Sequence, residues 1–345
     1  MPFALPPKMK RNLYRTRLEA FALCVLLLCW TYETPQEIQW VEYFAGLGNL
    51  SSMMKASHYT SLRFDILDHK QESHRSSNYM DFTHSSGFGL AILAVLRCIP
   101  GDFASHLGVK CSSFSRMNVG TSRRMACDAI GYLAYSSVQL GNILLERTAL
   151  MVLLITAMDG VWTVEQPSGS LLEFYPAWRE VVNSIFRCGG DYAVQKVNWW
   201  MAHYKSKTPK RHLAFGNTKV LLALDRGRLR KWKRAGVSKV QTAVHYLDKQ
   251  GKKRYKGTAQ LKGTEHYPMP FARAMVDIVE QMKAARRGCP QLPEVVPPFQ
   301  EVLTWDWLES DVWQCAGLDD LYKYLRGASA LKIPQDLKRH FPKEL

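Results

Sequence analysis

Short apolar runs alternate along this chain with longer segments whose apolar residues recur at helical spacing. The short runs predict strands at Glu37–Phe44, Ser61–Ile66, Phe103–Val109, Val161–Val164, Ala193–Trp200 and His212–Phe215. The longer segments predict helices at Asn49–Ser57, Gly87–Ile99, Met125–Met158 and Leu171–Cys188, the last broken near Tyr175 by Pro176. This alternation predicts an α/β fold with a Rossmann-like, mostly parallel sheet and helices on both faces.

The same pattern divides the chain into five segments. We expect a leader with a short apolar helix (1–36), a catalytic core (37–215), a small basic insert (216–264), a helix that completes the core (265–290), and a Pro-rich linker with a Trp-rich helical tail (291–345). The apolar run Ala20–Trp30 is too short to span a bilayer, so we expect no stable membrane association. Its basic flank leaves a signal or anchor within residues 8–30 as an alternative.

The charge of the chain is concentrated in one segment. The stretch His203–Lys262 holds 18 Lys and Arg against two Asp, which equals the net charge of +16 for all 345 residues. Such a basic segment predicts a polyanionic partner, most simply nucleic acid, and its alternative interpretation is a solvated, poorly ordered insert. The eight cysteines form no CxxC pair, which favours a reducing, intracellular compartment (nuclear or cytoplasmic) and gives no support for a metal.

A glycine turn follows the first predicted strand. The sequence Phe44-Ala-Gly-Leu-Gly48 allows a tight turn and close approach of the backbone to a ligand. Asp65, at the end of the next strand, is suitably spaced to accept the hydroxyls of a bound ribose. NAD and S-adenosylmethionine both carry that ribose. Asp81 is a candidate partner for an adenine amino group, and its alternative interpretation is a helix cap or turn residue.

A cysteine and a glutamate each come directly after a later strand. Cys111 stands in the Ser-rich loop Cys111-Ser-Ser-Phe-Ser115, which favours a nucleophile over an inert buried thiol. Asn118 continues this loop with a further donor. Glu165 ends the strand before Pro167, where a protonated carboxyl could donate to a ring nitrogen of a base; the alternative is an ion pair with a basic neighbour.

The order of these motifs resembles that of the DNA (cytosine-5) methyltransferases, over roughly residues 39–285. The matching segments are Phe44–Gly48, Cys111–Ser115, Glu165–Pro167, Lys207–Arg211 and His266–Phe271. The chain departs from the family at Val109-Lys110, where the family has Pro-Pro, and at Gln166-Pro167, where it has Asn-Val. The basic insert also stands where the family has a target-recognition domain.

The resemblance implies S-adenosylmethionine-dependent methyl transfer to C5 of cytosine through a covalent cysteine intermediate, with DNA favoured over RNA as the substrate. It assigns catalysis to Cys111, Glu165 and Arg211, and substrate contacts to Ser115, Asn118 and Lys210. It assigns the cofactor S-adenosyl-L-methionine to Phe44, Ala45, Gly46, Gly48, Asp65 and Asp81. The alternatives are a non-catalytic nucleic-acid-binding relative of the same fold and an NAD-dependent oxidoreductase, which leaves Cys111 and Glu165 unexplained.

Overall fold

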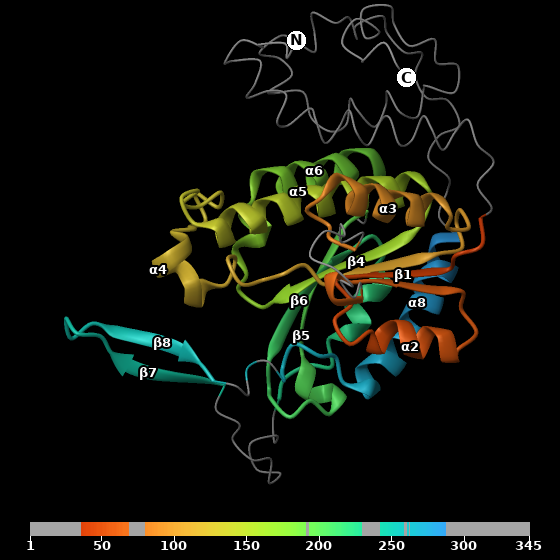
Figure 1. Ribbon diagram of the computed structural model, residues 1–345. Helices are drawn as coiled ribbons and strands as arrows, with labels where there is room; N and C mark the ends of the chain where they lie inside the picture. Colours follow the sequence, from red (N-terminus) through yellow and green to blue (C-terminus); the bar gives the residue numbers. More distant parts are fainter. Residues whose placement is uncertain are drawn as a thin grey trace, which may run out of the picture.

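The computed structural model describes residues 36–68, 80–190, 193–229, 242–258, 261 and 263–287. Within these residues the protein has an α/β architecture built on a six-stranded, mostly parallel mixed sheet (Figure 1). The predicted leader, apart from its last residue, and the predicted Trp-rich tail lie outside the described residues.

The central sheet has the strand order β2-β1-β3-β4-β6-β5. Its strands are β1 (Trp40–Tyr43), β2 (Ser61–Phe64), β3 (Ala104–Leu107), β4 (Val161–Pro167), β5 (Gln195–Trp200) and β6 (Arg211–Gly216). The first four run parallel, whereas β6 is antiparallel to both of its neighbours. The chain passes from β1 to β2 on one side and then to β3 on the other, so the strand order reverses beside β1. The start of β6 lies at the same edge as the carboxyl ends of β1, β3 and β4.

Helices cover both faces of the sheet, as predicted. On one face lie α3 (Ser85–Leu96), α5 (Ser136–Ala157) and α6 (Pro176–Gly189), and on the other α2 (Asn49–Ala56) and α8 (Met269–Arg287) (Figure 1). Each layer has its own apolar core, because alternate strand residues face opposite sides. Val41 and Trp162 pack toward α3, α5 and α6, whereas Trp40 and Trp199 pack toward α2 and α8.

Two predicted elements differ in extent from those observed. The predicted helix Met125–Met158 begins only at Ser136, because residues 125–135 form turns around Gly131, whose φ is +75°. A Cβ at Gly131 would lie 2.7 Å from the side chain of Arg124. Strand β4 continues to Pro167 because it pairs with β6, so Glu165 lies inside the strand and not beyond its end. The break near Tyr175 is confirmed: a 3₁₀ turn, Leu171–Phe174, precedes α6.

Among the described residues, Ser136–Ala157 is the helix with the length and hydropathy that a membrane span requires. Leu145, Val152 and other residues of this helix lie in the protein core, as in the core helix of many globular proteins.

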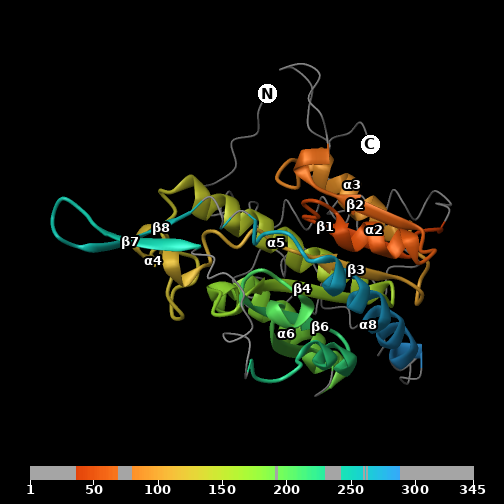
Figure 2. The same ribbon diagram turned by 90° about the horizontal axis from the view of Figure 1, so that it is seen from below.

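The predicted basic insert has two described parts. A 3₁₀ segment, Lys219–Leu224, buries Leu221 and Leu224 against the core, so the core extends past residue 215. The strands β7 (Ala243–Leu247) and β8 (Lys253–Gly257) then form an antiparallel hairpin. Figures 1 and 2 both show this hairpin projecting away from the body of the protein, on the side of the short helix α4 (Val119–Ser122).

Candidate active site

The glycine turn leaves β1 in left-handed backbone geometry. Phe44 has a φ of +59°, Gly46 of +55° and Gly48 of +67°. The backbone N–H of Gly46 donates to Oδ2 of Asp65 at 2.8 Å, which joins the turn to the end of β2. A Cβ at Gly46 would meet no atom within 4 Å, so there is open space beside this residue. Ala45 is buried, and its carbonyl accepts from the Gly48 N–H at 2.8 Å.

The two candidate cofactor carboxylates differ in what they contact. Asp65 accepts one backbone N–H on each oxygen, from Gly46 and from Leu67, which leaves it acceptor capacity for further donors. Asp81 accepts from the N–H and hydroxyl of Thr83 and pairs with His84. Although burial opposes it, these contacts lower the pKa of Asp81. Asp81 therefore has the turn-capping geometry that was its alternative interpretation.

Exposed apolar side chains flank Asp65 and the turn. Leu47 is 57% exposed, Ile66 50% and Leu67 77%. On the inner side, the ring of Phe44 packs against Phe82 with centroids 4.9 Å apart. Apolar surface, open space and a carboxylate with spare acceptor capacity together suit a nucleoside, whose base is flat and whose sugar carries hydroxyls.

The loop that carries Cys111 is fixed by hydrogen bonds to its backbone carbonyls. Five of its backbone carbonyls accept hydrogen bonds. Val109 accepts from Nε2 of Gln166, Ser112 from Nδ2 of Asn118, and Ser113 from Nε of Arg124. Cys111 accepts from the N–H groups of Phe114 and Ser115, and Phe114 accepts from the N–H of Leu171. Gln166, which stands where the resembling family has Asn, is itself held by the Ser170 hydroxyl at 2.9 Å. The loop is thus fixed to β4 and to the 3₁₀ turn that follows it.

Two predicted substrate contacts help to build this loop. Asn118 donates to the Ser112 carbonyl, and the Ser115 hydroxyl accepts the Met117 N–H at 3.3 Å. The predicted substrate contacts of Ser115 and Asn118 stay predictions, but both side chains already have these structural partners.

Glu165 lies at the centre of a buried polar network. Its Oε1 pairs with Nδ1 of His212 at 2.5 Å, and its Oε2 accepts from the Tyr267 hydroxyl at 2.8 Å. Burial alone would raise the pKa of Glu165, but the contacts with His212, Lys210 and Tyr267 outweigh it and lower the pKa to about 2. The expectation of a protonated Glu165 is therefore wrong for the free protein, in which a Glu165 carboxylate is held by His212 and Tyr267, both in hydrogen-bond contact with it.

The network continues to β3. Because Tyr267 donates its proton to Glu165, its oxygen accepts from Nε2 of His106 at 2.9 Å. The other ring nitrogen of His106 lies 2.7 Å from the Thr163 hydroxyl. Burial lowers the pKa of His106 to about 4, so this histidine is neutral at pH 7. The backbone carbonyl of Tyr267 accepts from Asn49 at 2.7 Å, which links the network to the glycine turn.

Cys111 is partly exposed and lies within electrostatic reach of Glu165 and Lys210. Burial raises the pKa of its thiol, the charge of Lys210 opposes this rise, and Glu165 adds to it. Cys111 is therefore a protonated thiol at pH 7 in the free protein. The Lys210 ammonium donates to the Thr264 carbonyl at 3.2 Å, just before Tyr267 in sequence. The structure thus brings together Cys111, Glu165 and Lys210 from the predicted set.

Arg211 does not share this position. It is exposed, and its guanidinium lies 5.5 Å from the centre of the Trp200 ring. Neighbouring residues of a strand point to opposite faces, so His212 and not Arg211 meets Glu165. The proposed contact of Arg211 with a flipped nucleotide stays a prediction.

Sequence reasoning missed His106 and His212 as members of this site, and it marked Tyr267 only as part of the resembling segment His266–Phe271. The signal for His212 was present: it follows Lys210-Arg211 at the start of a strand, which places it at the sheet edge. No sequence signal singles out His106, whose partner Tyr267 is 161 residues away.

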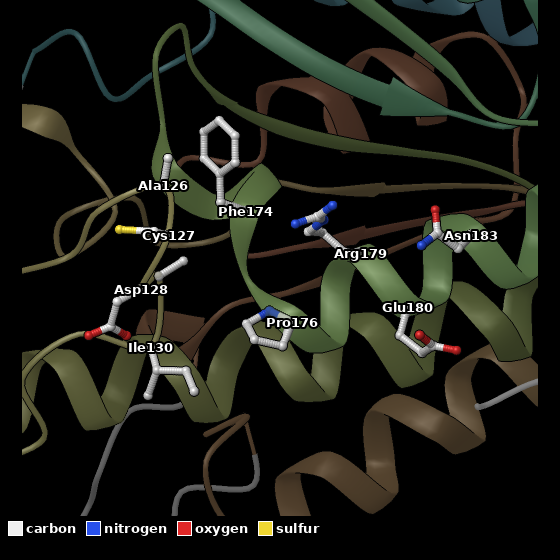
Figure 3. A pocket seen from close by; sticks show the side chains of 10 residues that line it. Ala126, Cys127, Asp128, Ile130, Phe174, Pro176, Arg179, Glu180 and Asn183 are labelled. Atoms are coloured by element: carbon white, nitrogen blue, oxygen red, sulfur yellow. The ribbon is translucent and has the colours of Figure 1, made fainter. Parts of the chain in front are cut away.

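A separate cavity of about 410 Å³ lies between the loop 126–130 and α6 (Figure 3). Its walls include Cys127, Asp128, Phe174, Arg179 and Asn183, and neither Cys111 nor Glu165 lines it. Among the described residues, no group of three or more His, Cys, Asp or Glu side chains is placed to hold a metal ion.

No protein-family model, curated protein or solved structure matches this chain. The function is therefore inferred from the site itself.

Proposed function

We propose that this protein transfers a methyl group from S-adenosylmethionine to C5 of cytosine in nucleic acid, with Cys111 as the nucleophile. The observation that carries the proposal is the position of Tyr267. This residue contacts Asn49 at the glycine turn through its carbonyl and Glu165 through its hydroxyl. A Cβ at Gly108, three residues before Cys111, would lie 3.3 Å from that hydroxyl. Three segments far apart in sequence thus meet at one edge of the sheet.

The strand order supports a ligand at this edge and the Rossmann-like assignment of the fold. Ligands of open α/β sheets bind outside the carboxyl ends of strands where the strand order reverses, and here the order reverses beside β1. The residues there fit an adenosyl group: the space beside Gly46 is open, Asp65 has acceptor capacity for ribose hydroxyls, and Ile66 offers apolar surface to a base. When bound, S-adenosylmethionine supplies an electrophilic methyl group on a sulfonium.

The residues of the chain then have distinct tasks. The Cys111 sulfur bonds to C6 of a cytosine that has left its stack, and the thiol proton passes through the Glu165 carboxylate to N3 of the ring. The neutral adduct has a nucleophilic C5, which takes the methyl group. The C5 proton then leaves to solvent as the S–C6 bond breaks. The N3 proton returns through Glu165 to the sulfur and restores the thiol. Lys210 stabilises negative charge on sulfur during addition.

Glu165 is ionised and held in place, but its pKa of about 2 opposes proton uptake in the free protein, so the proposal requires bound cytosine to raise that pKa. A carboxylate accepts a proton that a carboxylic acid could not, and Tyr267 and His212 hold its two oxygens in fixed positions. Entry of cytosine would let its amino group donate to the carboxylate as well. Neutral His106 donates a hydrogen bond to the Tyr267 hydroxyl, which orients it toward Glu165, and adds no charge to the site.

The hairpin of β7 and β8 supports a nucleic-acid partner. Lys249, Lys252, Lys253 and Lys256 are exposed on it, and the carboxylate of Asp248 is engaged by backbone N–H groups of the tip. An isolated two-stranded hairpin is at best marginally stable in water, and this one has little contact with the core. A two-stranded ribbon fits the major groove of B-form DNA, whereas the major groove of an RNA duplex is deep and narrow. These features favour DNA.

One observation favours the alternative of a non-catalytic nucleic-acid-binding protein. The raised pKa of Cys111 keeps the nucleophile protonated in the free protein. Incubation with methyl-labelled cofactor and duplex DNA distinguishes the methyltransferase from the binding protein. Transfer of label to DNA by the wild type but not by Cys111→Ser supports the methyltransferase. Cofactor and DNA binding without transfer supports the binding protein. Binding of NAD in preference to S-adenosylmethionine would contradict both.

A further inference from the structure

Arg124 is fully buried and yet forms no ion pair in the described part of the chain. Its five N–H donors all reach neutral oxygens, those of the Ser113 carbonyl and hydroxyl and of the carbonyls of Ala129, Ile130 and Val138. Fully buried arginines without a directly paired carboxylate are rare, because their desolvation is costly, and here Asp128 acts on Arg124 only through a longer-range charge interaction. Such a residue needs an explanation beyond packing.

The guanidinium joins three segments that are separate in sequence. It binds the nucleophile loop at Ser113, the turn 129–130, and the first turn of α5 at Val138. It also lies 3.9 Å from the centre of the Phe114 ring. Beside the guanidinium, a Cβ at Gly141 of α5 would lie only 2.2 Å from the Ser113 hydroxyl and 3.1 Å from Nη2 of Arg124. Ser113 of the loop is therefore packed directly against both Arg124 and α5.

We propose that Arg124 is the positioning residue that sets the place of the Cys111 sulfur by holding Ser113 and Phe114. The inference rests on the proposed role of Cys111 as a nucleophile. A loop carrying a nucleophile must be held to a fraction of an ångström, and a planar donor with five directed N–H groups does this better than apolar packing. Arg124 also connects the loop to residues 129–130, which form part of the wall of the cavity in Figure 3.

Arg147 provides a matched control. It too is buried, donates to backbone carbonyls (of Phe82 and His84), and lies over an aromatic ring, that of Phe88 at 4.9 Å. The hydrogen bonds and ring contact of Arg147 lie away from the nucleophile loop, so its loss should destabilise the protein without moving Cys111.

The test measures the alkylation rate of Cys111 by iodoacetamide in the full chain between pH 7 and 10, resolved by mass spectrometry of the Cys111 peptide. We expect Arg124→Met to accelerate alkylation about tenfold and to move its pH midpoint toward that of an ordinary thiol, because the thiol is released from burial. Arg124→Lys keeps the charge but not the five directed donors, so its alkylation rate should lie between those of the wild type and Arg124→Met. Arg147→Met should match the wild type.

If Arg124→Met does not fold, Gly141→Ala serves instead, because its new methyl group would push the Ser113 hydroxyl away from the Arg124 guanidinium without removing Arg124. The same acceleration is expected. A folded variant at either position with the wild-type rate and pH profile would overturn the proposal, as would equal acceleration in Arg147→Met. Because the readout uses neither cofactor nor nucleic acid, a failure of the proposed methyl transfer would leave this result standing.

Discussion

The phenol of Tyr267 donates to the Glu165 carboxylate at 2.8 Å, although 102 residues separate the two in sequence. Tyr267 precedes α8, and Glu165 lies in β4, so this bond fixes the start of a helix on one face to the edge of the sheet. The same hydroxyl touches His106 of β3. The bond thus holds the start of α8 beside Glu165 and Gly108, three residues before Cys111.

Removal of this donor should change both charge and activity. Tyr267→Phe takes away a hydrogen bond to a charged oxygen, so the pKa of Glu165 should rise, and the free energy of unfolding at pH 7 should fall by about 2 kcal/mol. We expect kcat for methyl transfer to fall more than cofactor affinity. Tyr175→Phe is the control, because Tyr175 donates to Glu146 at 2.5 Å away from the site. Equal kinetic losses in both variants would contradict the assignment.

Glu42 in β1 should make stability depend on pH. It is 1% exposed, its Oε2 accepts from Ser51, and its Oε1 has no hydrogen-bond partner among the described residues. Burial raises its pKa from 4.5 to about 7. Because the folded protein holds the Glu42 proton more tightly than the unfolded chain does, this proton stabilises the fold fully below pH 4.5. The stabilisation is lost as pH rises through about 7, and the free energy of unfolding falls by about 3 kcal/mol.

Glu42→Gln should remove this dependence. Urea unfolding at pH 4.5 and pH 8 should show the variant gaining about 3 kcal/mol relative to the wild type between the two values. Asp81→Asn provides a control of opposite sign. Since the pKa of Asp81 is lowered from its ordinary 3.8, its stabilisation is lost only on acidification below that value, so Asp81→Asn should keep the wild-type difference between pH 4.5 and pH 8 and lose stability dependence only at lower pH. A wild-type slope in Glu42→Gln would show that Glu42 is not the titrating group.

The hairpin should control affinity for duplex DNA and its salt dependence. Lys252→Gln with Lys253→Gln removes two exposed charges, so the slope of log K against log salt should become shallower by about 2, uniformly across sequences. Lys55→Gln with Lys219→Gln removes two exposed charges from the body of the protein and should change the slope less. Fluorescence anisotropy with labelled duplexes measures both. Identical slopes in the two double variants would exclude the hairpin as the contact.

The strand order could not be predicted, but the strands themselves could, because each is a short apolar run that ends in polar residues. The glycine turn and the Cys111 loop could also be predicted, because their small and polar residues are unsuited to a core and follow directly on predicted strands. The helix predicted from Met125 begins 11 residues later, because Arg124 captures the carbonyls of Ala129 and Ile130, and no periodicity reveals such a contact.

The partner of Glu165 was beyond sequence reasoning for a geometric reason. Whether Arg211 or His212 faces Glu165 depends on the direction and register of β6, and an antiparallel strand pairing Glu165 with Ala214 selects His212. The ionised state of Glu165 follows from that register. Asp65 and Gly46 were each assigned to the cofactor from the sequence, and the structure joins them by a hydrogen bond of 2.8 Å, while the cofactor contact stays a prediction.

The central claim is that the Cys111 sulfur bonds to C6 of a cytosine while a methyl group arrives at C5. Duplex DNA containing 5-fluorocytosine tests it, because fluorine cannot leave as the C5 proton does and the adduct persists. With S-adenosylmethionine, we predict a protein–DNA adduct stable to denaturant, whose mass includes one methyl group and whose cross-linked peptide contains Cys111. Cys111→Ser should form none. No adduct from wild-type protein that binds both cofactor and DNA would contradict the account.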